Sequence, residues 1–181
     1  MEKTPGIRPR RSFGQRLDRT ARRGFPGAIT IFAMVIAGAP FGLPGQAQLL
    51  PAITLASVFF WSLFRPVAFP PPFVFVLGLL ADLMEEMPPG VSVLILLLTQ
   101  MLVLRIRRPL GKQSFLFVWL IFTIVAAVAT ALQWALCSLL DWTFFPPASG
   151  LFVFLLATGL YPLIAIVFIQ AHRSLAAPEQ T

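Results

Sequence analysis

Residues 78–90 have the sequence Gly-Leu-Leu-Ala-Asp-Leu-Met-Glu-Glu-Met-Pro-Pro-Gly, and this stretch decides how the rest of the chain is laid out. It begins inside an apolar run and ends at a Pro-Pro-Gly turn. Asp82, Glu85 and Glu86 lie between, and they are three of only seven acidic residues in the chain. In a helix the spacing i, i+3, i+4 places all three on one face. A carboxylate at bilayer depth costs about 2.5–3.5 kcal/mol, so this acidic face indicates a membrane helix that ends near the headgroups.

The composition is that of an integral membrane protein. Of the 181 residues, 57% are hydrophobic and 12% are charged, and the mean hydropathy is +0.84. In a typical soluble domain about 25% of the residues are charged. A soluble chain that is long enough for only one domain could not bury so much apolar surface. The single cysteine, Cys137, excludes an internal disulfide.

The basic residues are concentrated near the N-terminus. A net charge of +7 would suggest nucleic-acid binding in a soluble protein, but eight of the fourteen basic residues precede the first apolar run. Next to a membrane span, such a cluster is a topology signal with affinity for anionic lipids, so we expect no nucleic-acid partner. We expect residues 1–23 to form a mobile cytoplasmic tail. The apolar run after them is too long for a cleaved signal segment, which predicts an uncleaved first span.

Apolar runs and Pro/Gly turns predict six membrane spans in one domain of residues 24–171, followed by a short cytoplasmic tail of residues 172–181. The spans are expected at about 25–43, 47–64, from the Pro70–Pro72 lead-in to 84, from 89 or 91 to 104, within 113–140, and at 151–169. Trp61, near the end of the second span, is expected at the membrane interface.

The distribution of charge supports six spans. With the N-terminus inside, every Lys and Arg falls in a cytoplasmic segment, including Arg65 and the basic loop 105–112, while Glu85 and Glu86 fall outside. A four-span arrangement with 66–104 as a re-entrant hairpin keeps the same sides but buries these carboxylates at depth. The predicted fold class is therefore an all-α bundle of six transmembrane helices with both termini cytoplasmic.

The sequence contains no pattern typical of catalysis or of a cofactor. The sole histidine, His172, follows the last apolar run, and no G-x-S-x-G, P-loop or metal-ligand spacing occurs. A cation site at Asp82 with Glu85 or Glu86 is an alternative, but an acidic helix end at headgroup level explains these residues equally well. Gln100 and Gln133 are interpreted as interhelical hydrogen-bonding groups that hold the bundle together, in preference to the walls of a substrate cavity.

Several short motifs point to a known family. The most specific are Arg65-Pro66, Pro70–Pro72, Gly78–Asp82 and Pro88-Pro89-Gly90; shorter ones are Gln113-Ser114-Phe115, Trp119, Gln133-Trp134 and Tyr161-Pro162. Over about residues 25–175 these motifs resemble the MreD family of bacterial rod shape-determining membrane proteins. The chain departs from the family in its longer basic tail and at Glu85-Glu86, where small or neutral residues are more frequent.

The resemblance implies a non-enzymatic scaffold of the cell-elongation machinery in the bacterial inner membrane, without a cofactor. It would bind MreC directly and lie in one complex with MreB, RodA and a class B penicillin-binding protein. The family is also similar in its six-helix plan to the S components of energy-coupling-factor transporters, so the alternative is a small-molecule-binding transporter subunit.

The candidate residues fall into two groups. Partner-binding or structural roles are expected for Arg65, Asp82, Glu85, Glu86, Pro88, Gly90, Gln113 and Gln133. Contacts with anionic lipids or a cytoplasmic partner are expected for Arg105, Arg107, Arg108 and Lys112. Asp82, one turn deeper than the outer turn, is expected to cap or bond a neighbouring helix.

Overall fold

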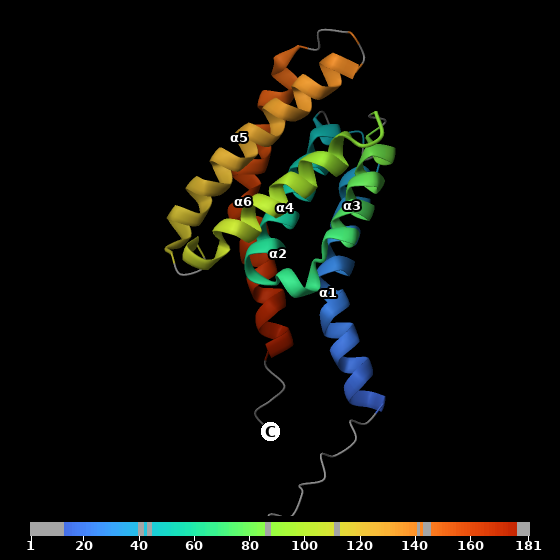
Figure 1. Cartoon of the computed structure of the whole chain (residues 1–181), viewed down its shortest axis with the longest axis vertical. Coiled ribbons are helices and arrows are strands. Elements are labelled where there is room, and N and C mark those ends of the chain that lie inside the picture. Colours follow the sequence, from blue (N-terminus) through green and yellow to red (C-terminus); the bar gives the residue numbers. More distant parts are fainter. Residues whose placement is uncertain are drawn as a thin grey trace, which may run out of the picture.

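The computed structural model describes residues 13–39, 42, 45–85, 88–110, 113–140, 142 and 146–176, with side chains between residues 24 and 170. Almost all of this part is helical, and no strand occurs in it (Figure 1). The α-helices are α1 (Phe13–Gly38), α2 (Leu49–Phe64), α3 (Pro71–Met84), α4 (Val91–Leu110), α5 (Phe115–Leu140) and α6 (Pro147–Ala176), and the short 3-10 helices are η1 (Gln46–Gln48) and η2 (Pro66–Ala68). The predicted all-α class is confirmed for these residues.

Successive α-helices run in opposite directions (Figure 1). The start of α1 and the end of α6 therefore lie at one end of the bundle, which we call the terminal end. The connections α1–α2, α3–α4 and α5–α6 lie at the other end, which we call the distal end. Helices α3 and α4 form one antiparallel hairpin and α5 and α6 another, and α2 packs against α1, α4 and α6.

Helix α2 forms the centre of the bundle, and every side chain from Thr54 to Leu63 in it is buried. A helix that is apolar on all sides is stable only when other elements surround it. Phe59 lies at the middle of an aromatic cluster, with ring centroids 5.1 Å from Phe122 and 5.7 Å from Tyr161 in edge-on contacts. Phe122 and Tyr161 stack at 4.2 Å. This cluster fixes α2 against the α5–α6 hairpin.

Three helical segments of the described chain are long and apolar enough to cross a membrane: Gln46–Phe64, Phe115–Leu140 and Pro147–Gln170. The helical segments Gly24–Gly38 and Pro71–Met84 are apolar but shorter than the roughly 20 residues of a typical span. Large apolar side chains are exposed along the outside of the bundle, for example Leu116 and Val128 of α5. The chain is therefore a helical protein suited to a membrane environment.

Three helices extend through basic segments in which the sequence predicted tails or a loop. Helix α1 begins at Phe13, so that residues 13–23 are helical, and α6 continues to Ala176. Helix α4 likewise continues to Leu110 and includes Arg105–Arg108. Arginine is a good helix former, and cations near a helix C-terminus interact favourably with the macrodipole. The helices are therefore longer than the expected spans, whereas the boundaries between the tails and the membrane domain stay predictions; residues 1–12 and 177–181 lie outside the described part.

The sequence predicts Trp61 at the membrane interface, but its side chain is only 1% exposed. The turn through η2 folds Phe69 back over α2, and the two rings stack with centroids 6.5 Å apart. Phe168 of α6 covers another side of the indole at 4.9 Å. The tryptophan therefore belongs to the core, because the connection that follows α2 turns inward.

Candidate functional site

Asp82 lies in the last turn of α3 and joins this helix to the start of α4. Its side chain is 1% exposed. The backbone N–H of Gly90 donates to Oδ2 at 2.7 Å, and the backbone N–H of Ser92 donates to Oδ1 at 2.8 Å. The first amides of a helix lack partners within the helix, and its N-terminus carries partial positive charge. Asp82 thus acts as a cap supplied by the preceding helix, which is the kind of contact expected for it.

Two glycines allow the α3–α4 hairpin to close tightly around this cap. A Cβ atom on Gly78 would lie 2.5 Å from Cα and 2.8 Å from N of Val93, so the two helices touch through their backbones there. Gly90 has a φ of +105°, a conformation that glycine adopts at no steric cost. The turn residue Pro88 accepts a hydrogen bond from the N–H of Val91 at 3.3 Å. Gly78, Asp82 and Gly90 therefore form one closely packed joint between α3 and α4.

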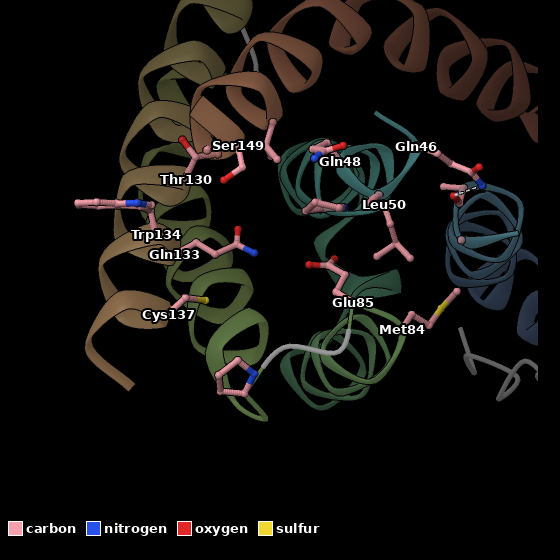
Figure 2. Close-up of a pocket in the computed structure, with 17 residues that line it drawn as sticks. Gln46, Gln48, Leu50, Met84, Glu85, Thr130, Gln133, Trp134, Cys137 and Ser149 are labelled. Carbon is pink, nitrogen blue, oxygen red and sulfur yellow. Dashed lines mark hydrogen bonds between the residues drawn. The ribbon is translucent and has the colours of Figure 1, made fainter. Parts of the chain in front are cut away.

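Glu85 follows the last residue of α3, and its side chain points into the bundle (Figure 2). Its backbone N–H donates to Ala81 at 2.9 Å. Both carboxyl oxygens are buried, and no described residue forms a hydrogen bond with either. Burial, and in second place the charge of Asp82, raise the pKa of Glu85 to about 8. The carboxyl group is therefore largely protonated at neutral pH.

The burial of Glu85 corrects the expectation that it faces the headgroups outside the bundle. Asp82 and Glu85 are three residues apart and share one face of α3. Asp82 turns this face toward α4 and the bundle interior, and Glu85 follows it inward. Glu86, the third acidic residue of the predicted face, lies outside the described residues.

Glu85 lines a cavity of about 660 Å³ at the distal end. Its walls come from the end of α1, from η1, from the starts of α2 and α6, and from the second half of α5. Helix α5 packs mainly on α4 and α6, which leaves this space beside α2. In Figure 2 Gln133 and Cys137 point from α5 toward Glu85, while the ring of Trp134 points away. This volume is in the range of small-molecule sites, about 300–1,000 Å³.

The lining of the distal cavity is apolar with a few polar groups. Leu50, Met84 and Val153 contribute apolar surface; the polar lining residues are Gln46, Gln48, Glu85, Thr130, Gln133 and Ser149. Oε1 of Gln48 is buried and has no hydrogen-bond partner among the described residues. An apolar pocket with a few convergent polar groups is the usual form of a binding site for an organic ligand.

A smaller space of about 20 Å³ lies deeper, between α2, α3, α4 and α5. Glu85, Thr130 and Gln133 line both spaces, and Thr54 and Ser92 line only the deeper one. About 10–15 Å³ suffices for one water molecule, so the deeper space holds one group of that size. The carboxyl group of Glu85 therefore lies beside a polar recess as well as the distal cavity.

The two glutamines predicted to hold the bundle together have different positions. Gln100 is 2% exposed, and its Nε2 donates to the backbone oxygen of Phe69 at 2.7 Å, which ties α4 to the connection before α3. Gln133 lies on the wall of the distal cavity, and its interhelical contact stays a prediction. The interpretation as a bundle contact thus holds for Gln100, and Gln133 is placed where it can meet a ligand.

The remaining predicted residues lie at the terminal end, away from the distal cavity. Arg65 ends α2, where its backbone N–H donates to Trp61 at 2.8 Å. Gln113 is exposed just before α5, and its backbone N–H donates to Leu110 at 3.1 Å. The three arginines of α4 are exposed or half-buried: Arg105, Arg107 and Arg108. Lys112 lies outside the described residues. The structure brings these basic residues together near one end but gives none of them a partner-specific contact.

No group of three His, Cys, Asp or Glu side chains that could hold a metal occurs in the part of the chain that the structure describes. Sequence reasoning missed Gln48 and Ser149 as cavity residues, because Gln48 falls within the span expected at 47–64 and Ser149 falls in the connection before the span expected at 151–169. A signal for Glu85 was present in its three-residue spacing from Asp82. No family model, no curated protein and no solved structure matches this chain.

Proposed function

We propose that the chain is a six-span inner-membrane scaffold of the bacterial cell-elongation machinery, of the MreD type. In this proposal α1 to α6 all cross the membrane and both termini are cytoplasmic. The antiparallel order of the helices supports it, because α1 begins and α6 ends at the same end of the bundle (Figure 1). Helices α1, α3 and α4 have shorter apolar segments, and in α4 the arginines that follow the apolar run lengthen the span when they snorkel to the headgroups.

Charge supports the same orientation. The arginines that end α2 and α4, Arg65 and Arg105–Arg108, lie toward the terminal end, and the basic N-terminal segment precedes α1. Acidic Asp82 and Glu85 lie toward the distal end. The positive-inside rule then assigns the terminal end to the cytoplasm and the distal end to the periplasm.

The observation that carries the proposal is the joint formed by residues 78–90. This stretch contains two of the four most specific motifs of the MreD resemblance, and Gly78, Asp82 and Gly90 each have a distinct structural role in it. A motif whose members act together in one turn is a stronger basis for a resemblance than scattered identities. The joint would present a rigid turn at the periplasmic face, where MreC is expected to bind.

The proposed mechanism is positioning rather than chemistry. The distal turn would hold MreC, while the basic residues at the terminal end would contact anionic lipid and cytoplasmic components such as MreB. RodA and a class B penicillin-binding protein would join the same complex through these partners. Such an adaptor links the two sides of the membrane through six packed helices and needs no catalytic group.

Co-purification in mild detergent tests this function. The tagged protein should recover MreC and elongation-complex components, and Asp82→Ala should reduce the recovered MreC more than Glu86→Ala, because Asp82 holds the turn together. Each variant should first be shown to be monodisperse by gel filtration. Recovery of MreC at wild-type level with folded Asp82→Ala would contradict the assigned role of the turn.

A small-molecule-binding subunit of a transporter is the second candidate, favoured by the distal cavity and its polar lining. In the six-span orientation this cavity would face the periplasm, where a ligand would arrive. Mass spectrometry of small molecules in the same purification separates the two functions. A stoichiometric ligand together with an ATPase module would support transport, and MreC without a ligand would support the scaffold.

A further inference from the structure

The described lining of the distal cavity contains one acidic side chain and no basic one. Glu85 is the single acidic residue in its described lining, and no Lys, Arg or His is among the residues that form its walls there. The other polar groups are the amides of Gln46, Gln48 and Gln133 and the hydroxyls of Thr130 and Ser149. Such a lining provides acceptors and one carboxyl group but no cation. It therefore matches a ligand that carries positive charge and disfavours an anionic one.

The carboxyl group of Glu85 has no described hydrogen-bond partner, in contrast with that of Asp82 one turn earlier. Both carboxyl oxygens of Glu85 are buried, whereas each oxygen of Asp82 accepts a backbone N–H. Buried polar groups in native proteins are nearly always paired, so an unpaired carboxyl group on a cavity wall requires an explanation. A donor on a bound molecule would supply the missing partner.

We propose that the distal cavity binds a small organic amine, with its ammonium group against Glu85 and its apolar body between α2 and α5. The recess of about 20 Å³ beside Glu85 accommodates a group of the size of one water molecule. An ammonium group has this size and donates three hydrogen bonds, which the two carboxyl oxygens of Glu85 and the hydroxyl oxygen of Thr130 can receive. The apolar surfaces of Leu50 and Val153 cover the remainder of the ligand.

An apolar ligand such as a lipid chain fits these observations less well. It would fill the space but leave the Glu85 carboxyl group as unpaired as before. The amine proposal is argued from the distal cavity and does not depend on the scaffold role. A failure to recover MreC would therefore not contradict it. It would give the ligand class for the transporter candidate, and it would make a scaffold responsive to an amine.

Cys137 provides a built-in reporter, because it is the only cysteine in the chain and lines the distal cavity opposite Glu85 (Figure 2). Its thiolate attacks a methanethiosulfonate reagent, forms a mixed disulfide and releases methanesulfinate. The probes are the trimethylammonioethyl and sulfonatoethyl methanethiosulfonates, which differ in the sign of their charge. Each rate, measured on the intact protein in dodecyl maltoside, is divided by the rate with a small thiol in solution.

The cationic reagent should react faster than the anionic one by about tenfold at a pH of about 9, where Glu85 is ionised. The ratio of the cationic to the anionic rate should fall at a pH of about 7, because the pKa of Glu85 is about 8 and its carboxyl group is then mostly protonated and uncharged. Among the described residues, the titratable groups near Glu85 are Asp82 on α3 and the thiol of Cys137 on α5. Ionisation of the thiol affects both reagents equally and therefore does not change the ratio of their rates. The described lining from α1, η1, α2 and α6 contains no titratable side chain.

Glu85→Gln should bring the ratio close to one at both pH values, because it keeps the shape of the side chain and removes its charge. Glu86→Gln is the matched control from the adjacent position, and it should keep the wild-type ratio. Equal ratios in wild type and folded Glu85→Gln would overturn the proposal. If Glu85→Gln does not fold, the wild-type ratio at the two pH values tests the proposal. A ratio that is higher at a pH of about 9 than at about 7 supports it, and a ratio that does not change with pH overturns it.

A second experiment tests occupancy. Tryptamine should protect Cys137 from N-ethylmaleimide, an uncharged reagent, whereas tryptophol, which has a hydroxyl in place of the ammonium group, should protect it at least about tenfold less at equal concentration. Glu85→Gln should remove this difference. Equal protection by the two compounds in wild type would show a purely apolar cavity and would overturn the proposal, as would a lack of protection by both.

Discussion

Replacing Asp82 by alanine should destabilise the protein strongly, because it removes the acceptor of two backbone amides at the start of α4. A hydrogen bond to a charged group contributes about 1.5–3 kcal/mol, so the two bonds together contribute about 3–6 kcal/mol. Removing a buried carboxylate offsets part of this loss. We therefore expect Asp82→Ala to lower the free energy of unfolding by about 3–4 kcal/mol. Asp82→Asn keeps one acceptor oxygen and should cost about half as much.

The measurement is SDS-induced unfolding of the purified protein in mixed micelles, followed by far-ultraviolet circular dichroism. Hydrogen–deuterium exchange adds a local readout, since the amides of Gly90 and Ser92 should lose protection while amides in the middle of α4 keep it. Leu83→Ala is the control, because Leu83 lies on the same turn of α3 and is 70% exposed. It should change the free energy of unfolding by less than about 0.5 kcal/mol.

Two results would refute this reasoning. One is an Asp82→Ala protein whose free energy of unfolding is within about 0.5 kcal/mol of wild type. The other is a destabilised protein in which exchange rises uniformly along α4 with no local effect at its first amides. The first would mean that the cap contributes little, and the second would mean that Asp82 acts through general packing.

Three further predictions concern single contacts. Gly78→Ala should lower the free energy of unfolding by about 1–3 kcal/mol in the same SDS titration, because the new Cβ would meet the backbone of α4. Gly159→Ala is the control and should not lower it in this way, because a Cβ there has no neighbour within 4 Å. Gln100→Leu should cost about 1–2 kcal/mol, because it leaves the carbonyl before α3 unpaired, and Gln100→Glu should not restore that donor at neutral pH. The stability of wild type should fall as pH rises from about 4.5 to about 8, because over this interval the folded protein retains the Glu85 proton and the unfolded chain does not. Thermal unfolding measured across this pH range should show the fall in wild type and not in Glu85→Gln.

The fold could be predicted from local patterns wherever these patterns govern the structure. Apolar runs separated by Pro/Gly turns placed all six α-helices in their correct order, because the 3.6-residue helix satisfies the backbone of any long apolar run. The helix boundaries were less accurate where Arg-rich segments follow an apolar run. These segments favour helix as strongly as the run does, so nothing in the local sequence marks the end of α4 before Pro109.

The candidate site was only partly predictable, since its two carboxylates depend on different levels of structure. Asp82 could be interpreted as a helix contact because a charge so deep in an apolar run must have a partner. The distal cavity depends instead on the position of α5 relative to α2, which is set by the aromatic contacts of Phe59 and Phe122 far from the cavity. No local pattern encodes this distance, and Gln48 was therefore included in the second expected span without a role in a site.

Asp82 and Glu85 show how one acidic helix face can serve two separable purposes. Each oxygen of the Asp82 carboxylate accepts a backbone amide at the start of α4, and Asp82 is buried and lines neither cavity. No described residue forms a hydrogen bond with the Glu85 carboxyl group, and its raised pKa means that its burial reduces stability at neutral pH. Natural sites that bind ligands commonly reduce stability in this way. Substitutions of the two residues should therefore have opposite effects. Asp82→Asn should destabilise the protein and keep the preference of Cys137 for the cationic reagent. Glu85→Gln should stabilise the protein at neutral pH and abolish that preference. A parallel response of both variants would mean that the acidic face is a single structural unit.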